Sequence, residues 1–349
     1  MVLNRYLLGL CLLSPGLSIA AELQQVTVVD SAYQSRYQTC VLRLIETSTD
    51  RRAETIKDQC RAESRVLEQV VVASPLEVRI KDESETMLAD FVLTPHKPNY
   101  ILPISYNQNP NDILAIETGD ERLSLDNNEV QFQVSLKVPV ASNIFASEWD
   151  IYGAYTGRSF WQAYNNDASS PFRDTNHEPE AWLSRPLEFQ WGSFSAKALR
   201  LGFVHQSNGR SQLLSRSWNR VYADFIFQVD DFSFSFKPWY RIDEDEKADR
   251  GDSGGDDNPD IEDYMGKFEL LSAYKVGQHT FSLMLRNNLK SDNYGAADLS
   301  WSFPINDKMK GYVKYFNGYG ETLLDYNHRS NRLSVGFVVA DWLWVISRA

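Results

Sequence analysis

No stretch of this 349-residue chain is apolar over the roughly 20 residues that a membrane-spanning helix needs. The chain also lacks an excess of positive charge, because its formal net charge at pH 7 is −12. An acidic surface repels a phosphate backbone, so the composition argues against a nucleic-acid partner. Cysteine is scarce as well, since the sequence holds only Cys11, Cys40 and Cys60.

The most apolar segment lies at the amino end and predicts a secretory signal peptide. Arg5 precedes an apolar run from Tyr6 to Leu13, and small residues follow up to Ala20. A basic residue, a short apolar core and small residues in this order are typical of a cleaved signal. We therefore expect residues 1–20 to be removed, and Cys11 with them. A short anchor helix is the alternative.

Residues 21–90 are charged and predict a small helical extension in the periplasm. The segments 33–47 and 51–71 look helical, and a short polar turn separates them. Cys40 and Cys60 are nearly symmetric about this turn, so two antiparallel helices would place them opposite each other. An exported protein with two remaining cysteines most simply pairs them, which predicts a disulfide-linked helical hairpin. A disordered leader is the alternative.

From about residue 97 the hydrophobic pattern takes a period of two, which is the period of a β-strand with two different faces. The run from Val130 to Val138 alternates apolar and polar residues without error, and so does the run from Phe232 to Lys237. We count about 12 such runs. Their approximate limits are 97–106, 128–139, 147–164, 178–190, 193–206, 217–228, 231–242, 262–275, 278–289, 295–304, 309–317 and 330–342.

Short and long connections alternate between these runs. Tight turns follow residues 190, 228, 275 and 306, whereas polar loops span about 107–127, 164–177, 207–216, 243–261 and 318–329. Short turns on one rim, long loops on the other and aromatic residues near strand ends are typical of a bacterial outer-membrane barrel. The aromatic residues expected in such girdles are Trp149, Trp161, Trp182, Trp191, Trp218, Trp239, Tyr240, Trp301, Trp342 and Trp344.

These features predict an all-β fold, a twelve-stranded antiparallel transmembrane β-barrel over residues 91–349 that follows the small helical extension. Such a sheet must close on itself, because unpaired strand edges are not tolerated in lipid. The alternative is a soluble β-sandwich. The signal peptide, the aromatic residues and the loop asymmetry favour the barrel and a multi-pass location in the bacterial outer membrane.

One predicted hairpin carries reactive side chains on the face that touches lipid. The odd-numbered residues from 199 to 203 form an apolar row, and His205 and Ser207 continue that row to the outer rim if the amino end starts in the periplasm. Asn219 continues the apolar row of the next strand in the same way. A hairpin centred near Gln212 pairs residue 205 with residue 219, and opposed residues lie about 5 Å apart at Cβ.

This trio has the residue types of a nucleophilic site. A serine hydroxyl attacks when an imidazole takes its proton, and the imidazole is held in one tautomer through its other nitrogen. Ser207, His205 and Asn219 fit these roles, and the backbone N–H of Gly209 is open to an oxyanion. An amide suits this wall because an unpaired carboxylate beside hydrocarbon is costly. We expect an enzyme whose substrate is the bilayer; the alternative is that His205 is an ordinary polar residue of the rim.

Five blocks of the chain resemble, in order, the outer-membrane phospholipase A family. The block from His205 to Arg220 contains the trio and is similar to the active-site segment of that family. The other blocks are 169–179, 237–240, 257–261 and 318–327. The resemblance covers roughly residues 90–344 and implies hydrolysis of acyl ester bonds in phospholipids and lysophospholipids. It implies Ser207 as nucleophile, His205 as general base and Asn219 as orienter.

The same resemblance implies calcium dependence and pairing of two barrels. It implies that Ca²⁺ lies beside the oxyanion site, held by Ser169, the Arg210 carbonyl and Ser215, with Asp257 at a secondary calcium position. Oxygen ligands suit this hard cation, which would polarise the developing oxyanion. It also implies a reversible homodimer with calcium sites across the interface.

The chain departs from the family pattern at several positions. Gly157 stands where the family has a glutamine that supports the dimer contact, and Gln212 stands where it has an aspartate near calcium. We therefore expect a weaker dimer and a weaker secondary calcium site. The loop 243–260 is longer and rich in acidic residues, which predicts a solvated charge run, or extra cation binding as the alternative. The chain ends at Ala349 and not at an aromatic residue.

Two other functions fit a barrel: a passive pore or structural barrel, and an adhesin or receptor that uses its long loops. Neither needs polar groups on the lipid face. A channel also needs a wide lumen, and about 12 strands with bulky inward Arg, Tyr and Gln leave little room. The sequence leaves the acyl-position and head-group preference open.

Overall fold

A computed structural model describes residues 38–44, 55–57, 60, 74–86, 92–144, 147–249, 251–252, 254–306 and 309–343. The chain divides into two compact units, Met1–Val72 and Ala73–Ala349. The expected signal peptide at 1–20 and the carboxyl end from Trp344 lie outside the described residues.

The first unit contains the predicted disulfide. Residues 38–44 are helical, and so are residues 55–57. Cys40 and Cys60 are joined by a disulfide with their Cα atoms 5.6 Å apart, which confirms the predicted pairing. Both cysteines are buried together with Ile56, so the bond lies in a small apolar cluster.

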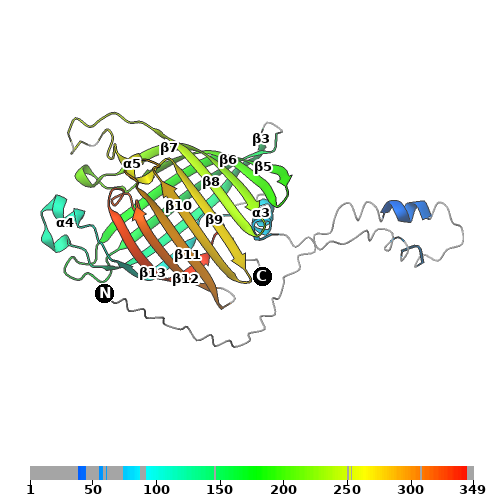
Figure 1. Ribbon diagram of the computed structural model, residues 1–349, viewed down its shortest axis with the longest axis horizontal. Helices are drawn as coiled ribbons and strands as arrows, with labels where there is room; N and C mark the ends of the chain where they lie inside the picture. The colour runs from blue at the N-terminus through cyan, green and yellow to red at the C-terminus, as the bar shows by residue number, and fades with distance from the viewer. Residues whose placement is uncertain are drawn as a thin grey trace, which may run out of the picture. The chain divides into compact units, whose positions relative to one another are not determined.

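The second unit is a closed antiparallel barrel of twelve long strands, as predicted (Figure 1). The sheet closes because each strand from β2 to β12 pairs with the next one along the chain, and β13 pairs back with β2. A two-residue strand, β1 (Thr94–Pro95), pairs with β3. The twelve strands are β2 (Asn99–Asn107), β3 (Asn128–Ile144), β4 (Trp149–Trp161), β5 (Phe172–Trp191), β6 (Phe194–Ser207), β7 (Ser217–Val229), β8 (Phe232–Ile242), β9 (Phe268–Val276), β10 (His279–Asn287), β11 (Gly295–Asn306), β12 (Met309–Tyr319) and β13 (Arg329–Ala340).

Three predicted limits were wrong, and one of them is the end of β3, which lies at Ile144 and not near residue 139. β5 begins at Phe172 and not near residue 178. The prediction placed this start too late because Asp174 and Asn176 are polar like loop residues, although they face the lumen within the strand. The segment expected to begin a strand at 262 forms the helix α5 (Ile261–Met265) instead. That helix stops at Gly266, which adopts φ +72°, and β9 follows two residues later.

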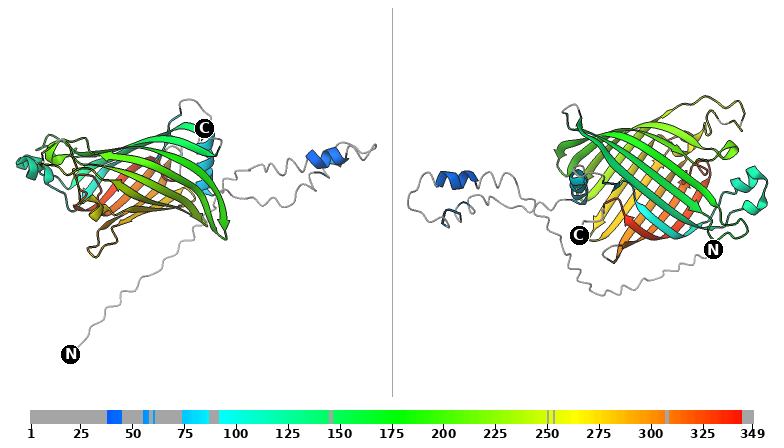
Figure 2. Two further views of the ribbon diagram at one scale, coloured as in Figure 1. Left: turned by 90° about the horizontal axis from the view of Figure 1, so that it is seen from above. Right: turned by 180° about the vertical axis from the view of Figure 1, so that it is seen from behind.

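The two rims of the barrel differ. Figures 1 and 2 show α4 (Ile113–Thr118) and α5 at the rim of long loops and α3 (Pro75–Thr86) at the rim of short turns. Glu77 and Glu83 of α3 pair with Lys197 and Lys137 of the barrel, each at 2.6 Å. Polar contacts with the wall thus hold α3 at this rim. None of the described helices is both long and apolar enough to cross a membrane.

The strand alternation separates an apolar outer wall from a polar lumen. Outward residues of several strands, such as Leu201, Phe225 and Leu283, are 37–43% exposed. Inward residues such as Gln131 and Ser105 are buried in the lumen at 0% exposure. An outer wall of this kind is what lipid contact requires, because hydrocarbon offers no hydrogen-bond partners.

The predicted aromatic girdles are only partly correct. Trp191 and Tyr240 are 79% and 64% exposed near strand ends, as expected. Trp182, Trp218 and Trp239 instead point into the lumen and are buried in one cluster, with exposures of 3%, 0% and 8%. Their places in the alternation explain the difference, because each occupies an inward position of its strand.

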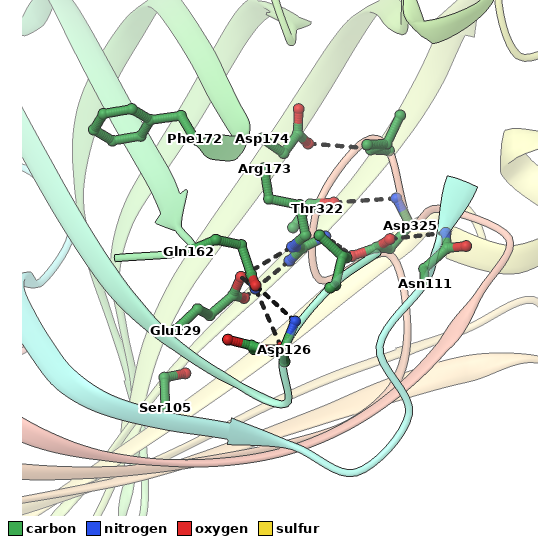
Figure 3. Close-up of polar contacts among 12 residues, drawn as sticks. Ser105, Asn111, Asp126, Glu129, Gln162, Phe172, Arg173, Asp174, Thr322 and Asp325 are labelled. Atoms are coloured by element: carbon green, nitrogen blue, oxygen red, sulfur yellow. Dashed lines mark hydrogen bonds and ion pairs between the residues drawn. The ribbon is translucent and has the colours of Figure 1, made fainter. Parts of the chain in front are cut away.

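Buried ion pairs fill the lumen near the long-loop rim (Figure 3). Arg173 pairs with Glu129 at 3.1 Å and with Asp325. Arg332 pairs with Glu129 and Glu321, each at 2.7 Å. A cavity of about 120 Å³ remains among charged and aromatic lumen residues. The lumen is therefore a packed polar core, which argues against a wide channel.

We expect Arg332→Ala to destabilise the barrel by about 3–5 kcal/mol, because it leaves the Glu129 and Glu321 carboxylates short of a buried partner. Urea unfolding in detergent, followed by tryptophan fluorescence, measures this change. Arg185→Ala is the control, since the Arg185–Glu148 pair spans 3.7 Å with side-chain exposures of 48% and 71%. Such an exposed pair contributes less than about 1 kcal/mol. Equal losses in the two variants would contradict a stabilising role for the lumen pairs.

Candidate active site

The β6–β7 hairpin places the candidate catalytic residues on the outer wall at the long-loop rim. His205 is in register with Asn219, which is the pair expected from the sequence, and Ser207 is in register with Ser217. The outward row of β6 continues from Leu201 and Phe203, which are 42% and 43% exposed, into His205 and Ser207. The trio therefore lies where the apolar wall meets the loops.

A hydrogen bond of 2.9 Å joins His205 Nδ1 to Asn219 Oδ1. An amide oxygen only accepts hydrogen bonds, so this contact places the proton of neutral His205 on Nδ1 and leaves Nε2 as the basic nitrogen. Ser207 lies two residues further along the same row, but within the described residues its hydroxyl makes no hydrogen bond with His205. Contact thus joins two members of the trio, and strand geometry brings the third to the same face.

The loop from 208 to 216 is held by Asn208, which is buried. Its Oδ1 accepts hydrogen bonds from the backbone N–H of Arg216 at 3.0 Å and of Arg210 at 3.3 Å. Gly209 adopts φ +62°, a conformation that favours glycine. Among the described residues no acceptor binds the Gly209 N–H. This N–H is therefore free to donate to an oxyanion beside Ser207.

A second imidazole, which the sequence analysis missed, flanks Ser207. His177 of β5 is in register with Ser207, and its Nδ1 lies 2.6 Å from the Tyr155 hydroxyl. A Cβ built on Gly209 would lie 3.6 Å from His177 Nε2. The outward alternation of β5 would have identified His177, but the predicted strand began one residue after it. Two histidines thus border the candidate nucleophile, and only His205 contacts an amide.

Three of the expected calcium residues lie in adjoining loops. Ser215 Oγ donates to Asp257 Oδ2 at 2.7 Å, and the Lys247 ammonium pairs with the other oxygen of the same carboxylate. The Arg210 guanidinium donates to the carbonyl oxygens of Phe172 and Arg173 at 2.9 and 2.6 Å. These contacts tie the Arg210 loop to the strand that follows the Ser169 loop.

Ser169 adopts φ +58° and makes no hydrogen bond with Arg210 or Ser215 in the described part of the chain. That part also contains no group of three or more His, Cys, Asp and Glu side chains that could hold a metal ion. The expected calcium ligands are different from such a group, because they are hydroxyl, carbonyl and carboxylate oxygens. Of these ligands, Ser215 contacts Asp257.

The acidic loop 243–260 touches the site, whereas the sequence predicted a solvated charge run, with extra cation binding as the alternative. Glu244 Oε1 accepts a hydrogen bond from Asn219 Nδ2 at 3.0 Å. Burial and the neighbouring Asp260 raise the pKa of Tyr326, which keeps this phenol neutral and able to donate to Asp260 at 2.6 Å. The loop is therefore anchored beside the trio and not free in solvent.

Comparison with known proteins gives one consistent family. The family model described as Phospholipase A1 matches residues 76–339. The chain is 35% identical to Phospholipase A1 of Klebsiella pneumoniae over 251 residues, which cover 72% of this chain and 83% of the relative. It is 34% identical to Phospholipase A1 of Escherichia coli K12 over 252 residues, with coverage of 72% and 82%.

Solved structures agree with this result. Outer membrane phospholipase A from Escherichia coli, solved as an active-site mutant, matches with a TM-score of 0.66 at 33% identity, covering 74% of this chain and 97% of that chain. The outer membrane phospholipase dimer of Salmonella typhi with bound calcium matches with a TM-score of 0.67 at 33% identity and the same coverage. With the closed barrel and the hairpin described above, these matches show that the chain belongs to the outer-membrane phospholipase A family, whose members are carboxylic ester hydrolases of the phospholipase A1 type.

Proposed function

We propose that this protein hydrolyses acyl ester bonds of phospholipids and lysophospholipids in the outer membrane, with calcium, through Ser207, His205 and Asn219. The His205–Asn219 hydrogen bond of 2.9 Å on the outer wall is the observation that carries this proposal. A pore or a receptor has no use for an oriented imidazole beside a serine on a lipid-facing surface. A lipase that draws its substrate sideways from the leaflet needs this placement.

In the proposed mechanism, His205 Nε2 takes the proton of the Ser207 hydroxyl as the serine oxygen bonds to the acyl carbonyl carbon. The carbonyl oxygen becomes an oxyanion, which the Gly209 N–H stabilises by a hydrogen bond. The imidazolium remains oriented by Asn219 and returns its proton to the departing lysophospholipid oxygen as the ester bond breaks. A water molecule, deprotonated by His205, then releases the fatty acid from Ser207.

The residues near Asp257 fit a calcium ion. Ser215 and Asp257 present oxygen atoms within 2.7 Å of each other, and the Lys247 ammonium at the same carboxylate indicates that the position favours positive charge. Ser169, the Arg210 carbonyl and Ser215 would hold calcium beside the oxyanion, with Asp257 at a secondary position. When bound, calcium supplies positive charge that polarises the ester carbonyl.

Replacing the nucleophile tests the proposal directly. Ser207→Ala should lower kcat by roughly 1,000-fold or more, and His205→Ala should do the same, because each removes a member of one catalytic unit. Acyl-ester hydrolysis in mixed micelles measures both. His177→Phe is the matched variant of the other imidazole and should keep kcat within roughly threefold. Full turnover by Ser207→Ala would reject the nucleophile. A severe loss in His177→Phe together with an active His205→Ala would assign the base to His177.

Calcium titration tests the ligands. We expect Ser169→Ala and Ser215→Ala to raise the calcium concentration for half-maximal activity by roughly tenfold, because each loses one oxygen ligand. Ser211→Ala is the control, since this hydroxyl lies in the same loop and is exposed. An unaltered titration curve for Ser169→Ala or Ser215→Ala would remove that residue from the ligand set.

We also propose a reversible homodimer that pairs through the wall carrying the site; the outer membrane phospholipase of Salmonella typhi is a dimer with bound calcium. Gly157 of β4 lies on this wall, in register with His177. Without a side chain it adds no hydrogen bond across the interface, so the dimer should be weak.

Gly157→Gln should therefore strengthen the dimer by about 0.6 kcal/mol or more, since an amide in lipid gains hydrogen bonds with a partner. Sedimentation equilibrium in detergent with calcium measures the change. Gly157→Ala adds a methyl group without a donor and should leave the affinity almost unchanged. Equal affinities for the Gln variant and the native chain would place the dimer contact elsewhere.

A further inference from the structure

Asn219 is held from two sides by hydrogen bonds of opposite polarity. Its Oδ1 lies 2.9 Å from His205 Nδ1, and its Nδ2 donates to Glu244 Oε1 at 3.0 Å. An ionised carboxylate only accepts hydrogen bonds, so Glu244 binds the amino end of the amide and leaves the carbonyl end for the imidazole. A half-turn of the Asn219 amide would break both hydrogen bonds. Glu244 thus selects the one amide orientation that accepts a hydrogen bond from His205.

The strand geometry explains how Glu244 reaches Asn219. Ile242, the last residue of β8, is in register with Asn219. Even-numbered residues of β8 such as Tyr240 and Ile242 are exposed on the outer wall, with exposures of 64% and 39%. Glu244 lies two residues further in the same alternation and is half-buried. It therefore continues the outward row of β8 beside the catalytic hairpin.

Contacts on both sides of Glu244 determine its position. Arg241 Nη2 pairs with Asp256 Oδ1 at 2.6 Å, and the backbone N–H of Asp256 donates to Asp245 O at 2.8 Å. The Lys247 ammonium also pairs with Asp257. The segment 241–247 is therefore fastened to the returning arm of the acidic loop both before and after Glu244. These contacts, together with the hydrogen bond to Asn219, hold the Glu244 carboxylate in place.

We propose that Glu244 is a positioning residue of the active site, which fixes the Asn219 amide so that Asn219 fixes His205. This inference rests on the proposed function. Glu244 adds a carboxylate to the end of the Ser207–His205–Asn219 series, and its negative charge favours the imidazolium that forms when Ser207 attacks. The acidic loop thus contributes to catalysis through one side chain and does not only solvate the rim.

The contact between Asn219 and Glu244 also explains why an amide stands at position 219. An aspartate there would set two carboxylates about 3 Å apart, and like charges at this distance cannot both remain ionised. The hydrogen-bond pattern can, however, be kept by exchanging the two groups. In the double variant Asn219→Asp with Glu244→Gln, the carboxylate at position 219 accepts a hydrogen bond from His205. The amide nitrogen at position 244 donates a hydrogen bond to the same carboxylate. With an aspartate at position 219, the exchange at position 244 restores both contacts.

The test compares four variants of the full chain in mixed micelles with phospholipid and saturating calcium: Glu244→Ala, Glu244→Gln, Asn219→Asp and the double variant Asn219→Asp with Glu244→Gln. Glu246→Ala is the control, because Glu246 is an exposed acidic residue two positions further in the same loop. Tryptophan fluorescence and heat-dependent gel mobility verify that each barrel is folded. The readouts are kcat and KM, since a residue that acts through His205 changes the chemical step and not lipid binding.

We expect Glu244→Ala to lower kcat by roughly 10- to 100-fold with KM unchanged, the range seen for residues that orient a functional side chain. Glu244→Gln should lose less, because its amide oxygen still accepts from Asn219. The double variant should exceed Asn219→Asp in kcat by roughly tenfold or more, a coupling that loop packing alone would not produce. Glu246→Ala should match the native chain.

Native kcat in Glu244→Ala would overturn the positioning role, and so would a double variant no faster than Asn219→Asp, or a loss in Glu246→Ala equal to that in Glu244→Ala. Ser207→Ala, assayed in parallel, separates this inference from the proposed function. If Ser207→Ala is inactive while the Glu244 variants behave as the native chain, only the inference fails. If Ser207→Ala is active, the catalytic assignment itself fails.

Discussion

Closure of the strand ladder is the constraint on which the rest of this structure depends. Hydrocarbon cannot satisfy backbone N–H and C=O groups, so every strand must have two neighbours, and β13 must pair with β2. Closure leaves each strand with one face to lipid and one to the lumen. The register of the β6–β7 hairpin then decides both that His205 meets Asn219 and that this contact lies on the outer wall. A shift of either strand by one residue would turn its side chain to the lumen and separate the pair.

The two faces treat polar groups in opposite ways. The lumen buries charge in large amounts, because Arg173, Arg332 and Glu129 satisfy one another there. Between its two rims the outer wall is mainly apolar, and the hairpin that carries the candidate site ends at the long-loop rim. The candidate catalytic residues lie there, at a height where a lipid ester and water are both within reach. Burial of charge stabilises the scaffold, and exposure of a few polar groups makes the site.

Three loops add residues to the candidate site beside the β6–β7 hairpin. The 208–216 loop supplies Gly209, the strand that follows the Ser169 loop is tied to Arg210, and the acidic loop brings Glu244 and Asp257. Strand alternation accounts for the face on which Glu244 lies but for none of the loop contacts. Their positions depend on side-chain hydrogen bonds between segments far apart in the chain, such as Tyr326 to Asp260. The site is thus a regular hairpin surrounded by irregular segments that the lumen and rim hold in place.

The sequence by itself determined the barrel, the twelve strands, the Cys40–Cys60 pair and the pairing of His205 with Asn219, because each follows from alternation or from local symmetry. The same alternation, applied strictly, would have placed Trp182 and Trp218 in the lumen. Only the tertiary structure decided that His177 flanks Ser207, that Lys247 neutralises Asp257 and that Glu244 holds Asn219. These contacts join different strands or a folded loop to the wall, and no periodicity in the chain encodes such distances.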